Sequence, residues 1–289
     1  MALASSVALS GALAASIPNV IEEQSRTVAG GRAIEVVVAQ SEIKSDINPS
    51  NLAVVTGGGL LGGLLAASQN ASRAKKAEAA ITPLRDALVN FDVDGLSLET
   101  TKHAVAQVSW LQPTAIILSK DSSVLGRSGY LDSSGVSQVS FIDYSYDVSP
   151  DFASIRVVAR LQFANKALPA GSTKPDSRLS PRNLAYVQTI TSVISLPGAG
   201  KDINANAASW AADGGKAAKA ALTLAFASID HLLPRTLGLT AADIKTMSGK
   251  DKPRGMAGGF AGRMQESGPS GDLLWAGGFV EAQLLPQGG

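Results

Sequence analysis

The chain has 289 residues, a formal net charge of +1 and no cysteine. The near-zero charge and an aromatic content of 5% argue against nucleic acid as a partner. Without cysteine there are no disulfides, thiolate nucleophiles or cysteine-ligated metal centres. This length suits one large domain or two small ones, of roughly 100–200 residues each.

The N-terminal residues, MALASSVALSGALAAS, are small or apolar and carry no charged side chain. Ala12-Leu13-Ala14 places small residues where a signal peptidase cuts. The basic residues that usually precede such a run are missing. We therefore predict a signal-like or flexible segment over residues 1–32 and an exported protein, with a core helix as the alternative.

A strand-like run, AIEVVVA, covers residues 33–39, and a glycine-rich segment, NLAVVTGGGLLGGLLAA, covers 51–67. Gly57-x-Gly59-x-x-Gly62 has the spacing of a dinucleotide-binding turn. The residues that follow predict helices instead of a second strand ending in an acidic residue. The Tyr-x-x-x-Lys of short-chain dehydrogenases is also absent from the sequence. We therefore reject a cofactor-binding turn here.

A different role fits these glycines better. Gly58, Gly59, Gly62 and Gly63 pair at a spacing of four, which places small residues on one helical face. Such faces allow two backbones to pack closely. We predict a close-packing role for these four glycines, and a membrane-surface or partner contact by the segment stays open.

Two helices are expected next. Apolar residues from Ala77 to Phe91 follow a helical spacing, and Pro83 predicts either a kink or a new helix capped by Thr82. The second helix is predicted over residues 97–110. Asp92 and Asp94 lie between the two helices, and we interpret them as a helix-ending turn because they lack the ligand count of a calcium loop.

The central part of the chain reads as strands. Residues 114–119 predict a short strand, and alternating patterns over 136–148, 154–164 and 185–196 predict an antiparallel meander. A helix is expected over 203–233, interrupted at Gly214-Gly215 because glycine is a poor helix former.

We therefore predict an α+β fold with an antiparallel sheet of about four to six strands. Helices from residues 60–110 and 203–233 are expected to cover one face of this sheet. The α+β domain is assigned to residues 33–247, and residues 248–289 are assigned to a Gly-rich C-terminal tail.

The last part of that tail, LLWAGGFVEAQLL, is too apolar for a simple linker. It either docks on its own domain or binds a partner. The candidate partner-binding residues are Leu273, Leu274, Trp275, Phe279, Val280, Leu284 and Leu285.

Other chemical motifs are incomplete. Ser41-x-x-Lys44 lacks the companion Lys-Thr-Gly of penicillin-recognising enzymes, and Gly198-Ala199-Gly200-Lys201 lacks the first glycine and the Ser/Thr of a phosphate loop. The only histidines, His103 and His231, have no second ligand nearby at metal spacing. We predict no catalytic set, no metal and no cofactor.

Three sequence segments, SRAKKAEAAITPLRDALVNFDVD, SWL and AASWAADGGKAAKAAL, resemble a family of uncharacterised exported proteins of proteobacteria. The resemblance covers roughly residues 34–233 and implies a place in the cell envelope. It carries no known chemistry, so no functional residue is transferred. The chain departs from the family in lacking a lipoprotein cysteine and a basic N-terminal region, and in its Gly-rich tail.

From these observations we expect a non-enzymatic periplasmic or envelope-associated subunit that binds a protein partner within a larger assembly. The alternative is an envelope protein that binds a small ligand or lipid in a cavity between the sheet and the helices. An enzyme, either a hydrolase or a degenerate dinucleotide binder, comes third.

Overall fold

The computed structural model describes residues 19–45, 75–166, 183–269 and 271–286. The glycine segment with Gly58, Gly59, Gly62 and Gly63, and residues 1–18 of the signal-like segment, lie outside the described residues.

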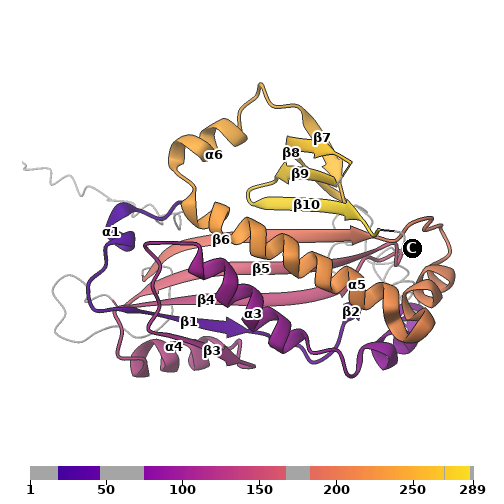
Figure 1. The fold of residues 1–289 in the computed structure, drawn as a ribbon, viewed down its shortest axis with the longest axis horizontal. Helices are drawn as coiled ribbons and strands as arrows, with labels where there is room; N and C mark the ends of the chain where they lie inside the picture. The colour runs from indigo at the N-terminus through magenta and orange to yellow at the C-terminus, as the bar shows by residue number, and fades with distance from the viewer. Residues whose placement is uncertain (1–18, 46–74, 167–182, 270, 287–289) are drawn as a thin grey trace, which may run out of the picture.

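Ten strands form one mixed sheet in the described part of the chain (Figure 1). They are β1 (Arg32–Val37), β2 (Lys44–Ser45), β3 (Ala115–Ser119), β4 (Gln138–Val148), β5 (Ser154–Asn165), β6 (Leu184–Ser195), β7 (Arg254–Ala257), β8 (Phe260–Gly268), β9 (Gly271–Trp275) and β10 (Phe279–Leu284). The spatial order is β3-β1-β4-β5-β6-β10-β9-β8-β7, and β2 pairs with β4 outside this path.

The expected meander is present, because β4, β5 and β6 pair antiparallel along most of their length. The long alternating strands place Ile142, Tyr144, Val157 and Ile190 in the main core on one face. Their neighbours in sequence point to the opposite face, as the two-residue period of a strand requires. The sheet therefore grows outward in both directions from this central meander.

The prediction of a four-to-six-strand antiparallel sheet is wrong. On one side, β1 runs parallel to both β3 and β4, because helical crossovers connect these strands. On the other side, β10 runs parallel to β6, and β7, β8 and β9 follow it as antiparallel neighbours. The Gly-rich segment that we assigned to a tail thus supplies four strands of the sheet.

Besides the helical residues 75–88, the described helices are α1 (Glu23–Arg26), α3 (Val93–Ala106), α4 (Val124–Ser133), α5 (Ile203–Gly238) and α6 (Ala241–Met247). The first of these helices continues through Pro83. Thr82 does not begin a new helix, since its hydroxyl donates to the Glu78 carbonyl one turn earlier, at 2.9 Å.

One helix boundary differs from the expectation, and one expected helix break is present. Asp92 begins α3 rather than ending a helix, because its carboxylate accepts a hydrogen bond from the Gly95 N–H at 2.8 Å. The interruption expected in α5 is confirmed, since Gly214 and Gly215 have φ of +65° and +77°. Such angles are incompatible with a continuous right-handed helix.

Helices α3 and α5 pack together on one face of the meander, in front of β4–β6 in Figure 1. Trp210 and Phe226 of α5 are fully buried there. The Trp210 Nε1 donates to the Phe152 carbonyl at 2.8 Å, which ties α5 to the turn between β4 and β5.

The described residues cover the second face of the sheet only near its two sides, and this departs from the expectation of helices on one face. Helix α4, which the sequence analysis did not predict, buries Leu131 against Ala33, Val139 and Phe141. At the other side, the turn between β7 and β8 folds back onto Val193 of β6. Between these covers, Ser145 and Arg160 are exposed on an open stretch of β4 and β5.

Candidate functional site

Strand β3 forms one open edge of the sheet. Among the described residues it pairs with β1 alone. The Thr114 N–H donates to the Arg32 carbonyl at 2.8 Å, at the start of the parallel pairing between β3 and β1. In a parallel pair, every second residue of a strand directs its N–H and C=O groups away from the neighbouring strand. These groups of β3 therefore point outward from the sheet edge. The strand sequence, AIILS, contains no charge, and Ile117 and Leu118 are each 37% exposed.

Helix α4 extends this apolar surface. Four residues separate it from β3, and the last of these, Ser123, is its N-cap and accepts a hydrogen bond from the Gly126 N–H at 3.0 Å. Its first residues, Val124 and Leu125, are 61% and 84% exposed. We call Ile117, Leu118, Val124 and Leu125 the β3–α4 apolar edge. Four of the seven exposed large apolar side chains in the described ranges belong to it. Ile117 and Leu118 are consecutive on β3, so they lie on opposite faces of this edge strand.

A buried arginine fixes α4 to the sheet. The Arg127 Nη1 donates to the Gln162 Oε1 at 2.7 Å, and its Nη2 pairs with the Asp143 carboxylate. The guanidinium carbon also lies 5.7 Å from the centre of the Phe141 ring. These contacts hold the start of α4 in one position beside β3. The β3–α4 apolar edge is therefore a preformed surface.

Two carboxyl groups under α4 have unusual environments. Burial raises the pKa of Glu35, while a hydrogen bond with Ser119 and the charge of Arg127 act in the opposite direction. Burial likewise raises the pKa of Asp143, against the charges of Arg127 and Arg160. Neither residue lines the groove described next. We interpret the cluster as the anchor of α4.

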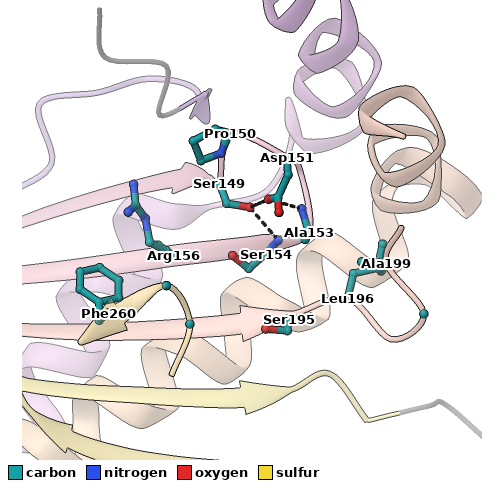
Figure 2. Close-up of a pocket in the computed structure, with 13 residues that line it drawn as sticks. Ser149, Pro150, Asp151, Ala153, Ser154, Arg156, Ser195, Leu196, Ala199 and Phe260 are labelled. Carbon is teal, nitrogen blue, oxygen red and sulfur yellow. Dashed lines mark hydrogen bonds between the residues drawn. The ribbon is translucent and has the colours of Figure 1, made fainter. Parts of the chain in front are cut away.

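A groove of about 690 Å³ lies on the same face of the sheet, at the ends of β5 and β6 (Figure 2). Its floor is the cross-strand pair Ser154 and Ser195, together with Arg156. The remaining lining residues are Ser149, Pro150, Asp151 and Ala153 from the β4–β5 turn, Leu196, Gly198 and Ala199 after β6, and Gly258, Gly259 and Phe260 from the β7–β8 turn.

The walls of the groove are held by local hydrogen bonds. The Ser149 Oγ donates to Asp151 Oδ1 at 2.6 Å and accepts from the Ser154 N–H at 3.0 Å. Partial burial acts to raise the pKa of Asp151, but hydrogen bonds from Ser149 and the Ala153 N–H outweigh it and lower the pKa. Asp151 is thus ionised at neutral pH, at the rim of the groove.

Arg156 joins the floor to the β7–β8 turn. Its guanidinium lies 2.7 Å from Asp147 Oδ1, and its central carbon lies 5.8 Å from the centre of the Phe260 ring. The positive charge of Arg156 is therefore balanced by Asp147 within the protein. The groove presents hydroxyls, a carboxylate and an aromatic ring, with no unbalanced arginine.

The partner-binding residues predicted in the tail come together, but they face inward. Leu273, Leu274, Trp275, Phe279, Val280 and Leu285 are 0–8% exposed, whereas Leu284 is 62% exposed. The first five lie on the adjacent strands β9 and β10, where Trp275 packs edge-to-face on Phe279 with ring centres 5.2 Å apart. Six of the seven are thus buried in this chain's own apolar core, and the exposed Leu284 is paired with Ser195 of β6.

The remaining sequence candidates do not form a catalytic or metal centre in the described ranges. The exposed His103 pairs with Asp230, with Nδ1 2.7 Å from Oδ2, and no group of three acidic or histidine side chains is placed to hold a metal there. Gly198 and Ala199, from the rejected phosphate-loop motif, line the groove.

Sequence reasoning missed both the apolar edge and the groove. The Gly258-Gly259 pair between two strands is a recognised hairpin signal, which would have placed Phe260 at the start of a strand. No sequence motif marks the floor of the groove, since its residues are only the polar positions of alternating strands: Ser154, Arg156 and Ser195. The edge position of β3 depends on pairing between distant segments.

No protein-family model, curated protein or solved structure matches this chain. None of the helices in the described ranges is both long enough and apolar enough to cross a bilayer.

Proposed function

We propose that this protein is a non-enzymatic interaction subunit of a larger assembly in the cell envelope, and that it binds its protein partner through β3. The β3–α4 apolar edge carries the proposal. An uncharged edge strand offers unpaired backbone groups to a partner strand, and the exposed apolar side chains beside it supply buried area. The envelope location rests on the signal-like N-terminal sequence and the family resemblance.

The opposite edge of the sheet supports this assignment by contrast. Strand β7 has only four residues, begins at Arg254 and follows Pro253. Short length, a charged residue and proline are features with which proteins protect an edge strand from pairing. Strand β3 is also short, with five residues, but it contains no charged side chain, so the two edges differ in charge.

A pair of matched substitutions tests the proposal. Ile117→Lys places a charge on the β3 edge, whereas Met256→Lys does the same on β7, where Met256 is 70% exposed. Both variants should fold, because both side chains already reach solvent. We expect Ile117→Lys to abolish partner capture and Met256→Lys to leave it unchanged. The measurement is affinity purification of tagged protein from gently solubilised cells, read by mass spectrometry and analytical ultracentrifugation.

The proposal fails if the wild-type protein is strictly monomeric and captures nothing specific, or if Ile117→Lys retains every partner. Loss of partners in both variants would also count against it, since this would trace the effect to added charge rather than to β3.

A further inference from the structure

The groove formed by the β4–β5 turn, the end of β6 and the β7–β8 turn is a second feature, independent of the β3–α4 apolar edge. Its volume of about 690 Å³ falls within the range of roughly 300–1,000 Å³ typical of small-ligand sites. Three separate parts of the chain converge on it, and Figure 2 shows their side chains arranged around the Ser154–Ser195 floor.

The chemistry of the floor and rim restricts the class of ligand. The side chains of Ser154 and Ser195 lie side by side on paired strands, and each hydroxyl can both donate and accept. Asp151 adds an acceptor at the rim. The Phe260 ring adds a flat apolar surface on the side opposite the Leu196–Ala199 loop (Figure 2). Hydroxyls and a carboxylate along the groove, with an aromatic ring at one end, match a ligand that has several hydroxyl groups on an apolar ring.

Charge argues against the other classes. The Arg156 guanidinium is already balanced by Asp147 at 2.7 Å, and the ionised Asp151 repels a phosphate or carboxylate at the rim. A bound divalent cation would need more ligands than the described acidic groups bring together. A lipid chain would leave the two floor hydroxyls without hydrogen-bond partners, which is costly.

We infer that this groove binds an uncharged saccharide, with one sugar ring against Phe260 and its hydroxyls bonded to Ser154, Ser195 and Asp151. The rigid turn geometry supports such binding. The Ser149 hydroxyl and the Ala153 N–H both donate to Asp151 Oδ1, so little side-chain entropy of Asp151 is lost when the ligand enters.

The test uses the full chain and three uncharged trisaccharides: triacetylchitotriose, cellotriose and maltotriose. Binding is followed by titration calorimetry and by amide chemical shifts in NMR spectra. We expect at least one of the three to bind with a dissociation constant on the order of 1 mM or below. The shifted amides should lie within residues 149–156, 195–199 and 258–260.

Two variants and one control localise the effect. Ser195→Leu fills the floor, and Phe260→Leu removes the ring while keeping an apolar side chain next to Val193. Each should weaken binding about tenfold or more. The control is Ser145→Leu, which makes the same serine-to-leucine change as Ser195→Leu at an exposed position of β4 outside the groove. This control should leave binding unchanged. Circular dichroism confirms that each variant is folded.

Three outcomes would overturn the inference. The first is the absence of binding by all three trisaccharides at about 10 mM, a concentration well above the expected dissociation constant. The second is a set of shifted amides outside the groove. The third is tighter binding of tripolyphosphate than of any trisaccharide at the same residues, which would reassign the site to anions.

Discussion

At the scale of single residues, Glu35 is the most unusual group in the described structure. It sits on β1 beneath α4, only 4% exposed, and its Oε2 has no hydrogen-bond partner. A buried carboxylate without full hydrogen bonding is expensive, because desolvation penalises the charged form. Arg127 lies close enough for its charge to lower the pKa of Glu35, yet burial outweighs this effect. The fold therefore tolerates a group that opposes its stability at neutral pH.

The pH dependence of folding should reveal this cost. The pKa of Glu35 is higher in the folded protein than the ordinary value of 4.5. Above the folded-state pKa, Glu35 is ionised and its burial lowers the free energy of unfolding by the full amount. This penalty decreases as the pH falls below the folded-state pKa, and it disappears near the unfolded-state value of 4.5. We expect Glu35→Gln to be more stable than wild type near pH 7, with the difference vanishing toward lower pH.

Urea denaturation of both proteins between about pH 5 and 8 measures this difference. The exposed Glu99→Gln on α3 is the control, and it should change stability little across the range. A Glu35→Gln protein that is less stable than wild type at pH 7 would show that ionised Glu35 is a net stabilising partner of Arg127.

At the scale of elements, the β7–β8 hairpin shows how glycine decides local structure. Gly258 and Gly259 have φ of +57° and +83°, the two positive angles of a type I′ turn. Gly258 has a second constraint, because a Cβ there would lie 2.7 Å from the Val193 Cβ. The hairpin can approach β6, and form one wall of the groove, only because this side chain is missing.

Two alanine substitutions separate these effects. Gly259→Ala adds only backbone strain, since no atom lies within 4 Å of the place that its new Cβ would occupy, and should cost about 1–2 kcal/mol. Gly258→Ala adds the clash with Val193 and should cost about 1–3 kcal/mol more. Thermal unfolding gives both values. In the Gly258→Ala variant, a second substitution, Val193→Ala, should recover part of the lost stability; in Gly259→Ala it should not. Equal losses of stability in Gly258→Ala and Gly259→Ala would contradict the close packing of Gly258 on Val193.

At the scale of the whole molecule, the C-terminal strands complete a sheet that the central meander begins. Strand β10 pairs with β6 over six residues, from Phe279–Ile190 to Leu284–Ser195. The pairing places Phe279 in the main core, where Arg235 of α5 lies 4.8 Å from the centre of its ring. Residues 254–284 are therefore as much part of the fold as the helices are.

Truncation after residue 248 should consequently destabilise the whole protein. It exposes one side of β6 and removes Trp275 and Phe279 from the core, and loss of a single buried aromatic side chain already costs about 3–5 kcal/mol. We expect the truncated chain to give a poorly dispersed NMR spectrum and no cooperative thermal transition. A well-folded truncated protein with unchanged melting temperature would show instead that β7–β10 form a separable unit. Partner binding is for this reason better tested with Ile117→Lys than by truncation.

The sequence by itself determined the local elements whose signals are contained in neighbouring residues. Alternation over 136–196 identified the β4–β6 meander, and the Gly214-Gly215 pair located the break in α5. It also identified the cluster Leu273–Leu285 as apolar, but could not tell docking on its own domain from binding a partner. Helical and strand periods depend on chain geometry, so a single segment is enough to read them.

Only the tertiary structure decided how these elements pair. Parallel pairing of β1 with β3, and of β6 with β10, joins segments that are far apart in the chain, and no local pattern encodes the choice of neighbour. The same pairing leaves β3 at an edge, turns β9 and β10 inward, and brings three distant turns around Ser154 and Ser195. Both candidate binding surfaces arise from this long-range arrangement, which depends on the burial free energy of the whole sheet rather than on any one segment.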